Sequence, residues 1–279
     1  MRLTWLVLVA AVTMVAVSPE LWQWPVPPSA PPPAPWLIYY GGLPSAPTPG
    51  ALATLEGRLT GYSLVVVHSG LEDPGNSSGA VVSALVQKMP QVFFYGYLAL
   101  GVTNGEPDYP AAQIATDLSR WRKLGVKGML LDTAGHDYGV SAARLDAAMA
   151  EAHQLGMRVI VNAYRPQDVL GAPWHPGDLY LAENWAYAEG QAVGPRAAVT
   201  LRSLYQLEMS GVAVAATATA ASGWPFAHSD LVSAVELTLA EVPGVRWMAV
   251  AGPNYSATSG GILPAITLEQ VARTISRTY

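Results

Sequence analysis

Short apolar runs alternate with amphipathic segments along most of the chain. Eight runs lack the strict alternation of a half-exposed strand, which is typical of strands buried on both faces of a parallel sheet. These runs are Trp36–Tyr40, Leu64–His68, Val92–Leu100, Val126–Asp132, Arg158–Asn162, Leu179–Glu183, Val212–Thr217 and Val245–Ala251. Segments with helical period lie between or after them, at Gly79–Lys88, Ala111–Lys123, Ala142–Leu155, Pro195–Ser210, Ser229–Ala240 and Leu268–Thr278. Alternating strands and helices predict a parallel sheet of the α/β class.

The number of strands decides between two architectures that this pattern allows. Eight repeats over roughly 245 residues match the size of a (β/α)8 TIM barrel. A doubly wound open sheet normally has a glycine-rich dinucleotide fingerprint after its first strand, whereas the turn after Trp36–Tyr40 reads GGLPS. We therefore expect a single barrel over residues 36–279. Its least regular interval, Ala163–Asp178, is expected to contain no more than a short helix.

Two segments precede the expected barrel. Residues 1–18 carry one Arg near the start and continue as an apolar stretch, which is typical of a secretory signal peptide or an uncleaved signal anchor. Residues 19–35 include LWQWPVPPSAPPPAP, and such a proline-rich tract favours an extended, semi-rigid linker. We expect a protein that is secreted or extracytoplasmic, with membrane contact only through this N-terminus.

Composition and charge limit the classes of function. Hydrophobic residues make up 51% and charged residues 13% of the chain, which suits a large folded core. The net charge of −5 and the absence of a Lys/Arg cluster argue against nucleic-acid binding. The chain has no cysteine, and its five histidines lack the HExxH spacing of a helical zinc site. We expect no metal, no organic cofactor and a monomer.

Residues that directly follow the strands of a barrel form its active face. Two carboxylates end apolar runs in this way, Asp132 after GMLL and Glu183 after LYLA. Sugar rings stack on aromatic side chains, and their hydroxyl groups need amide and carboxylate partners. The other strand-end residues fit that requirement and predict a carbohydrate cleft whose substrate-binding residues are Tyr40, His68, Tyr97, Asp137, Asn162, Tyr164 and Trp185.

Glycosidic cleavage requires one carboxyl group that protonates the leaving oxygen and a second that attacks or activates water. Asp132 and Glu183 are the expected pair, because strands two places apart in a barrel bring their ends close together. Simpler roles stay open for the same residues: Asp132 as a helix cap, Glu183 as an ion-pair partner of Arg158 or Arg165, Asn162 as a partner of loop backbone, His68 as a polar loop residue, Asp137 as a turn acid and Trp185 as a packing residue.

Four short motifs carry a resemblance to a known family. They are YGYLALG at Tyr95–Gly101, GMLLDT at Gly128–Thr133, VIVNAY at Val159–Tyr164 and LAEN at Leu181–Asn184. Together with IYYG at Ile38–Gly41, they resemble the polygalactosaminidase-like (β/α)8 glycosidases, which are glycoside hydrolase family 114 and its spherulin-4-like and Pel-type relatives. The resemblance implies that Asp132 and Glu183 are the catalytic pair and that Tyr40 and Tyr97 line the sugar subsite.

The residues and the resemblance together favour an exported glycoside hydrolase. The resemblance implies an α-linked, galactosamine-containing or similar amino-sugar polysaccharide as substrate, and a retaining mechanism with Asp132 as nucleophile and Glu183 as acid/base. A non-catalytic carbohydrate-binding barrel at the cell surface is the main alternative, since it needs the same aromatic rim. A different barrel enzyme, such as a deacetylase or a lyase, is a third interpretation.

Overall fold

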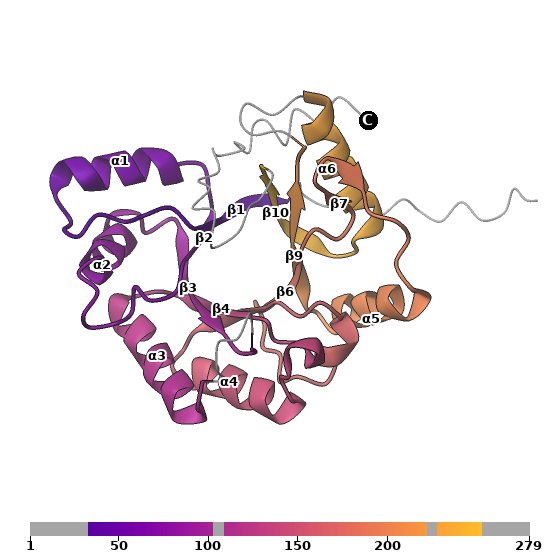
Figure 1. Cartoon of the computed structure of the whole chain (residues 1–279), viewed down its shortest axis with the longest axis horizontal. Coiled ribbons are helices and arrows are strands. Elements are labelled where there is room, and N and C mark those ends of the chain that lie inside the picture. The colour runs from indigo at the N-terminus through magenta and orange to yellow at the C-terminus, as the bar shows by residue number, and fades with distance from the viewer. Residues whose placement is uncertain (1–32, 103–108, 222–227, 253–279) are drawn as a thin grey trace, which may run out of the picture. The chain divides into compact units, whose positions relative to one another are not determined.

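The computed structural model describes residues 33–102, 109–221 and 228–252. Eight parallel strands close into a barrel, and the helices that connect them lie around its outside (Figure 1). The expected TIM barrel is therefore confirmed. The strands are β1 (Ala34–Tyr39), β2 (Leu64–Val67), β3 (Phe93–Ala99), β4 (Gly128–Asp132), β5 (Arg158–Val161), β6 (Leu179–Ala182), β9 (Ala213–Thr219) and β10 (Val245–Ala251).

Six helices and several short elements complete the described part of the chain. The helices are α1 (Pro49–Leu59), α2 (Gly79–Lys88), α3 (Ala111–Leu124), α4 (Ala142–Gln154), α5 (Ala198–Met209) and α6 (His228–Glu241). The expected short helix between β5 and β6 is the 3₁₀ turn η3 (Pro166–Val169); a second turn, η2 (His136–Tyr138), follows β4. The strands β7 (Tyr187–Ala188) and β8 (Gln191–Ala192) form a small hairpin after β6.

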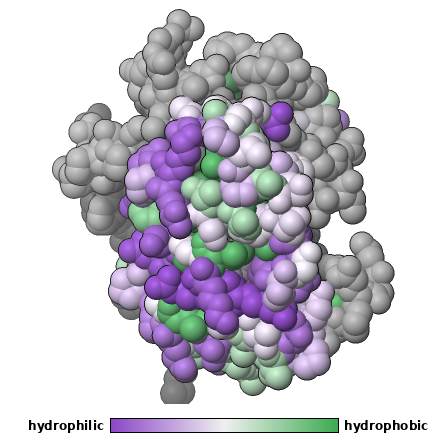
Figure 2. All heavy atoms as spheres, turned by 90° about the vertical axis from the view of Figure 1, so that its left-hand side faces the viewer, coloured by the Kyte–Doolittle hydropathy of each residue, from purple (hydrophilic) through white to green (hydrophobic). Residues whose placement is uncertain are grey.

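The barrel strands bury side chains on both faces, which explains their unbroken apolar runs. Alternate residues such as Ile38, Leu130 and Ile160 fill the barrel interior. The residues between them, such as Leu37 and Leu131, pack against the surrounding helices. Figure 2 shows that the side of the molecule bearing α1 and α2 is mostly polar with small apolar patches, as expected for an outer layer of helices in water.

Two helices differ from expectation, and three expected segments lie wholly or mostly outside the described residues. The sequence pattern named no helix after the first strand, yet α1 forms there, with Thr48 accepting a hydrogen bond from the Ala51 amide and Pro49 in the first turn. Its apolar stripe is too narrow for a periodicity signal, because only Leu55 and Leu59 are buried. Helix α5 begins at Ala198, three residues later than expected. The expected helix Leu268–Thr278, the signal segment 1–18 and most of the linker 19–35 lie outside the described residues.

The barrel begins slightly before the expected boundary. Strand β1 starts at Ala34, where Ala34 pairs with Trp247 and Pro35 with Met248 of β10. Pro35 is tolerated because it stands near the start of the strand and its carbonyl still accepts a hydrogen bond from Ser63. No helix among the described residues is long and apolar enough to span a membrane.

We predict that Gly96→Ala destabilises the barrel. A Cβ at this position of β3 would lie 2.4 Å from Cδ2 of Trp121, a fully buried side chain of α3. Overpacking of this kind costs about 1–3 kcal/mol, which denaturant unfolding can measure. Gly57→Ala is the matched control, because Gly57 is an exposed helical residue of α1 with open space around its Cβ. That change should stabilise the fold by about 0.4–1 kcal/mol, and equal effects of both changes would contradict the packing argument.

Candidate active site

The interior columns of the barrel end in a polar layer at the carboxyl ends of the strands. Leu130, Ile160 and Leu181 belong to the apolar interior. Side chains two residues apart in a strand share a face, so Asp132, Asn162 and Glu183 continue these three columns. Tyr40, His68 and Tyr97 continue the columns of β1, β2 and β3 in the same way. Most of the expected site residues therefore belong to one layer of the barrel interior.

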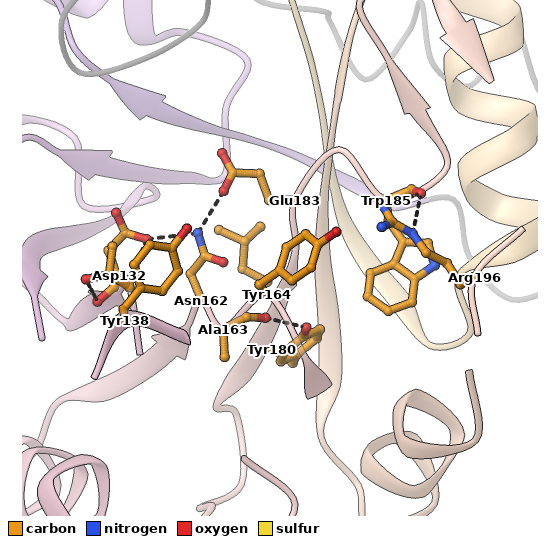
Figure 3. Close-up of a pocket in the computed structure, with 11 residues that line it drawn as sticks. Asp132, Tyr138, Asn162, Ala163, Tyr164, Tyr180, Glu183, Trp185 and Arg196 are labelled. Atoms are coloured by element: carbon orange, nitrogen blue, oxygen red, sulfur yellow. Dashed lines mark hydrogen bonds between the residues drawn. The ribbon is translucent and has the colours of Figure 1, made fainter. Parts of the chain in front are cut away.

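A pocket opens above part of this layer (Figure 3). It lies over β4, β5 and β6, and the segments that follow these strands complete its wall. Eleven residues line it: Asp132, Thr133, Tyr138, Asn162, Ala163, Tyr164, Tyr180, Leu181, Glu183, Trp185 and Arg196. Both expected catalytic acids and three of the expected binding residues are among them.

Asn162 connects the two acids. Its Nδ2 donates one hydrogen bond to Oδ1 of Asp132 and another to Oε2 of Glu183, each with a donor–acceptor distance of 2.9 Å. A side-chain amide nitrogen has two hydrogens, so one is available for each carboxylate. Asn162 therefore contacts the two carboxylates themselves and does not merely satisfy loop backbone.

This bridge limits the separation of the two acids. The two acceptor oxygens cannot be farther apart than twice 2.9 Å, or 5.8 Å. The planar amide directs its two hydrogens about 120° apart, which places the oxygens roughly 5 Å from each other. Retaining glycosidases have carboxyl groups about 5–5.5 Å apart, whereas inverting enzymes leave about 6.5–9.5 Å for a water molecule.

Asp132 is held by hydrogen bonds at both carboxylate oxygens. Oδ2 accepts a hydrogen bond from the Tyr97 hydroxyl, and Oδ1 accepts from the Thr133 amide at 2.8 Å as well as from Asn162. Burial raises the pKa of Asp132 above its ordinary value, although these three hydrogen bonds favour the ionised form and oppose the shift. The carboxylate is thus fixed in orientation while its basicity is increased.

Glu183 has a different environment. Its side chain is exposed to water within the pocket, and Asn162 provides its described hydrogen bond. Protein nevertheless surrounds the pocket, so desolvation raises the pKa of Glu183, and the charge of Asp132 raises it further. Water in the pocket screens part of this effect. No ion pair of Glu183 with Arg158 or Arg165 occurs among the described residues.

Backbone strain follows both acids. Thr133 has φ +52° and Asn184 has φ +45°, although neither is glycine. Thr133 is held there by hydrogen bonds from its hydroxyl to the Asp132 carbonyl and from the Gly101 amide to its Oγ1. The Asn184 amide donates to the backbone and side-chain oxygens of Thr217. Positive φ at a β-branched residue is uncommon, and strain of this kind concentrates at functional sites.

The other expected residues lie at different distances from the acids. Tyr40 lies close enough to both that their charges, after burial, raise its pKa. Tyr164 is 62% exposed at the pocket wall, whereas Trp185 is 3% exposed and buried behind it. His68 pairs through Nδ1 with the carbonyl of Ser69, and Asp137 is exposed on η2. Tyr40, Tyr97, His68 and Asp137 do not line the pocket. Tyr97 nevertheless donates to Asp132, whereas His68 and Asp137 make no described hydrogen bond to either acid.

Arg196 is a charged pocket residue that the sequence analysis did not name. It stands in a segment expected to be helical, but the later start of α5 leaves it in the preceding loop. Its Nε and Nη2 donate to the Trp185 carbonyl at 3.2 and 2.9 Å, and Nη2 also reaches the Asn184 carbonyl at 3.3 Å. A lone Arg after a glycine–proline pair gave no signal for this contact.

Sequence comparisons found no matching family profile and no matching curated protein. Comparison of structures gave many TIM barrels. One is 3-keto-L-gulonate-6-phosphate decarboxylase from Vibrio cholerae, with 14% identity, TM-score 0.48, and coverage of 89% of this chain and 100% of that chain. Pyruvate carboxylase from Rhizobium etli has 11% identity, TM-score 0.51, and coverage of 88% of this chain but 27% of that one. The pneumococcal exo-beta-D-N-acetylglucosaminidase StrH has 11% identity, TM-score 0.47, and coverage of 87% and 83%.

These likenesses are at a level that shows the fold alone. The similar structures are mostly enzymes, and their activities are unrelated to one another. A TIM barrel accommodates many chemistries by variation of the residues at its strand ends. The function of this chain must therefore be inferred from its own site.

Proposed function

We propose that this protein is an exported glycoside hydrolase that cleaves an α-linked, galactosamine-containing or similar amino-sugar polysaccharide with retention of configuration. The observation that carries the proposal is the Asn162 amide, which donates to Asp132 and Glu183 together and keeps Oδ1 of Asp132 within 5.8 Å of Oε2 of Glu183, twice the 2.9 Å bond length. That spacing suits direct attack by one carboxylate. The acidic pair also suits a sugar bearing an ammonium group, and the motif resemblance supplies the galactosamine assignment and the linkage.

The first chemical step uses the two carboxyl groups in different protonation states. Asp132, ionised and oriented by Tyr97, Thr133 and Asn162, attacks the anomeric carbon, while protonated Glu183 gives its proton to the departing glycosidic oxygen. The C–O bond to the leaving sugar breaks as the bond to Asp132 forms. The product is a covalent glycosyl ester of Asp132.

The second step reverses these roles. Glu183, now ionised, removes a proton from water, and the water oxygen attacks the anomeric carbon. The ester bond breaks, and Asp132 leaves as a carboxylate. Both acids return to their starting protonation states. Burial raises the pKa of Glu183, so it can hold a proton nearer neutral pH than an ordinary glutamate.

Release of sugar from defined polysaccharides tests the proposal. The chain from residue 19 to 279 would be incubated with partly deacetylated galactosaminogalactan and with a panel of other polysaccharides, beside Asp132→Asn, Glu183→Gln and Asp137→Asn. We expect release that the first two changes abolish and that Asp137→Asn preserves, because Asp137 lies outside the pocket. Release that survives either of the first two changes would remove that acid from the pair. Binding without release would favour the non-catalytic barrel.

A change of Tyr97 to Phe is expected to show which acid is the nucleophile. The Tyr97 hydroxyl donates to Asp132, and this bond lowers the pKa of Asp132. Its loss should therefore raise that pKa and leave Glu183 little affected. If Asp132 is the nucleophile, the acidic limb of the pH profile of kcat/KM moves to higher pH and the alkaline limb stays. Movement of the alkaline limb alone would exchange the two roles.

A further inference from the structure

The pocket carries opposite charges at its two ends. Asp132 lies at one end and Arg196 at the other, with Tyr164 between them (Figure 3). Arg196 is the single Lys or Arg among the lining residues. The proposed reaction uses the acidic end and gives Arg196 no chemical role.

One edge of the Arg196 guanidinium is occupied by backbone. Nε and Nη2 donate hydrogen bonds to the carbonyls of Asn184 and Trp185, the two residues after Glu183. Nη1 has two further N–H donors and takes part in no hydrogen bond among the described residues. The ion pairs of the described chain also leave Arg196 without a carboxylate. A half-buried guanidinium thus keeps an unneutralised charge beside the pocket.

Aromatic rings fix the position of this charge. Cζ of Arg196 lies 4.9 Å from the ring centroid of Trp185 and 6.0 Å from that of Tyr164. The guanidinium covers one face of Trp185, so a sugar cannot stack on that face. Tyr164 remains largely exposed beside it. A planar donor that is held in advance on carbonyls and rings loses little entropy when it binds a ligand.

We propose that Arg196 is a specificity-determining residue that binds an oxyanion on the sugar unit next to the one cleaved. The substrate would then be an acidic heteropolysaccharide, in which a unit carrying a carboxylate or a sulfate neighbours the amino sugar. An anion at the acidic end would be repelled by Asp132 and Glu183, so it belongs at the Arg196 end. The inference rests on the proposed function, because it requires a saccharide in the pocket.

Binding to matched ligands separates this role from a structural one. Asp132→Asn serves as the background, so that binding is measured without turnover. The first ligand pair is a uronate-containing oligosaccharide and its carboxyl-reduced form; the second is a sulfated oligosaccharide and its desulfated form. The chain from residue 19 to 279 would be titrated with each by calorimetry, with Arg196 unchanged and as Arg196→Gln and Arg196→Lys.

We expect the acidic member of one pair to bind more tightly than its neutral counterpart, and the pair that shows this identifies carboxylate or sulfate. Arg196→Gln should weaken binding of that acidic ligand by about tenfold to a hundredfold and change binding of the neutral ligand less than about twofold. Arg196→Lys should retain part of the preference, since it keeps the charge without the fork. Arg202→Gln on α5, outside the pocket, is the control and should behave as the parent.

Three results would overturn the inference: no preference for either acidic ligand, no binding of any acidic ligand, or equal loss of both members of a pair in Arg196→Gln. Equal loss would assign Arg196 to support of the loop after Glu183. Failure of the proposed function is a separate result. An Arg196-dependent preference in a protein that cleaves no polysaccharide would remove the hydrolase and leave the oxyanion subsite standing.

Discussion

Asp132→Asn is expected to abolish polysaccharide cleavage and, at neutral pH, to make the barrel more stable. In the proposed mechanism Asp132 is the attacking carboxylate, which a neutral amide cannot replace, and loss of a nucleophile of this kind lowers kcat by about 10⁴-fold or more. The amide can keep most of the local contacts. Its oxygen can still accept from Thr133 and Asn162, and its nitrogen can donate to the Tyr97 oxygen.

The gain in stability has a definite pH dependence. Burial raises the pKa of Asp132 above the ordinary value of 3.8, so the folded chain binds the proton more tightly than the unfolded chain. Below that ordinary value the group is protonated in both states and costs nothing. As pH rises from there through the folded pKa, ionisation destabilises the native protein. Asp132→Asn has no carboxyl group to ionise, so its Tm should exceed that of the parent by an amount that grows with pH. Each kcal/mol of difference in the free energy of unfolding corresponds to about 2–4 °C in Tm.

Thermal unfolding of both proteins from pH 4 to pH 8 measures this difference. Glu183→Gln is the matched comparison, because Glu183 is exposed to water in the pocket and its ionisation should cost less. We expect a similar loss of activity and a smaller gain in Tm. A gap between Asp132→Asn and the parent that is constant or shrinks with pH would contradict the raised pKa.

Asn162→Ala is expected to lower kcat by about 10²-fold and to shift the whole pH profile. The change removes the bridge, and misplacement of reacting groups by about 1 Å can cost that much. The Asn162 hydrogen bonds lower the pKa of Asp132 and of Glu183. Their loss should raise both, so the acidic and the alkaline limbs of kcat/KM both move to higher pH. This result differs from that of Tyr97→Phe, which should move one limb.

Asn184→Gly provides the control for that experiment. Asn184 directly follows Glu183, but its side chain makes no hydrogen bond to either acid among the described residues, and glycine adopts its positive φ easily. We expect both limbs to stay in place. A profile that is unchanged in Asn162→Ala would show that the bridge does not tune the acids, and a shift of the limbs in opposite directions would contradict the common sign.

The sequence predicted those features of the fold that depend mainly on burial of apolar side chains. Strands buried on both faces must be apolar throughout, so the eight runs were visible, and an acid at the end of such a run stands out. Period-two alternation also carries Asp132, Asn162 and Glu183 into the interior layer. Helix α1 was not visible because capping by Thr48 and Pro49, rather than a broad apolar stripe, marks it.

The hydrophobic pattern of the sequence could not predict contacts between segments that are distant along the chain. The Asn162 bridge depends on the register of β4, β5 and β6, which no local signal encodes. Arg196 lines the pocket because α5 begins after it and because the Arg196 guanidinium donates to carbonyls more than ten residues earlier in the chain. His68 and Asp137 share the composition of site residues, but His68 follows β2, away from the strand ends that line the pocket, and Asp137 is exposed on η2.

The two acids and the amide that joins them come from three consecutive strands, β4, β5 and β6. The proposed cleavage therefore depends on three neighbouring strand ends, and Arg196, the proposed specificity residue, binds the backbone that follows the third of them. Substitutions in the segment after β2 can change the rim without moving the acid pair. Relatives of this barrel could differ in the rim and in the polymer they bind while they keep the acid pair. A search for such relatives should give these three strand ends more weight than overall similarity.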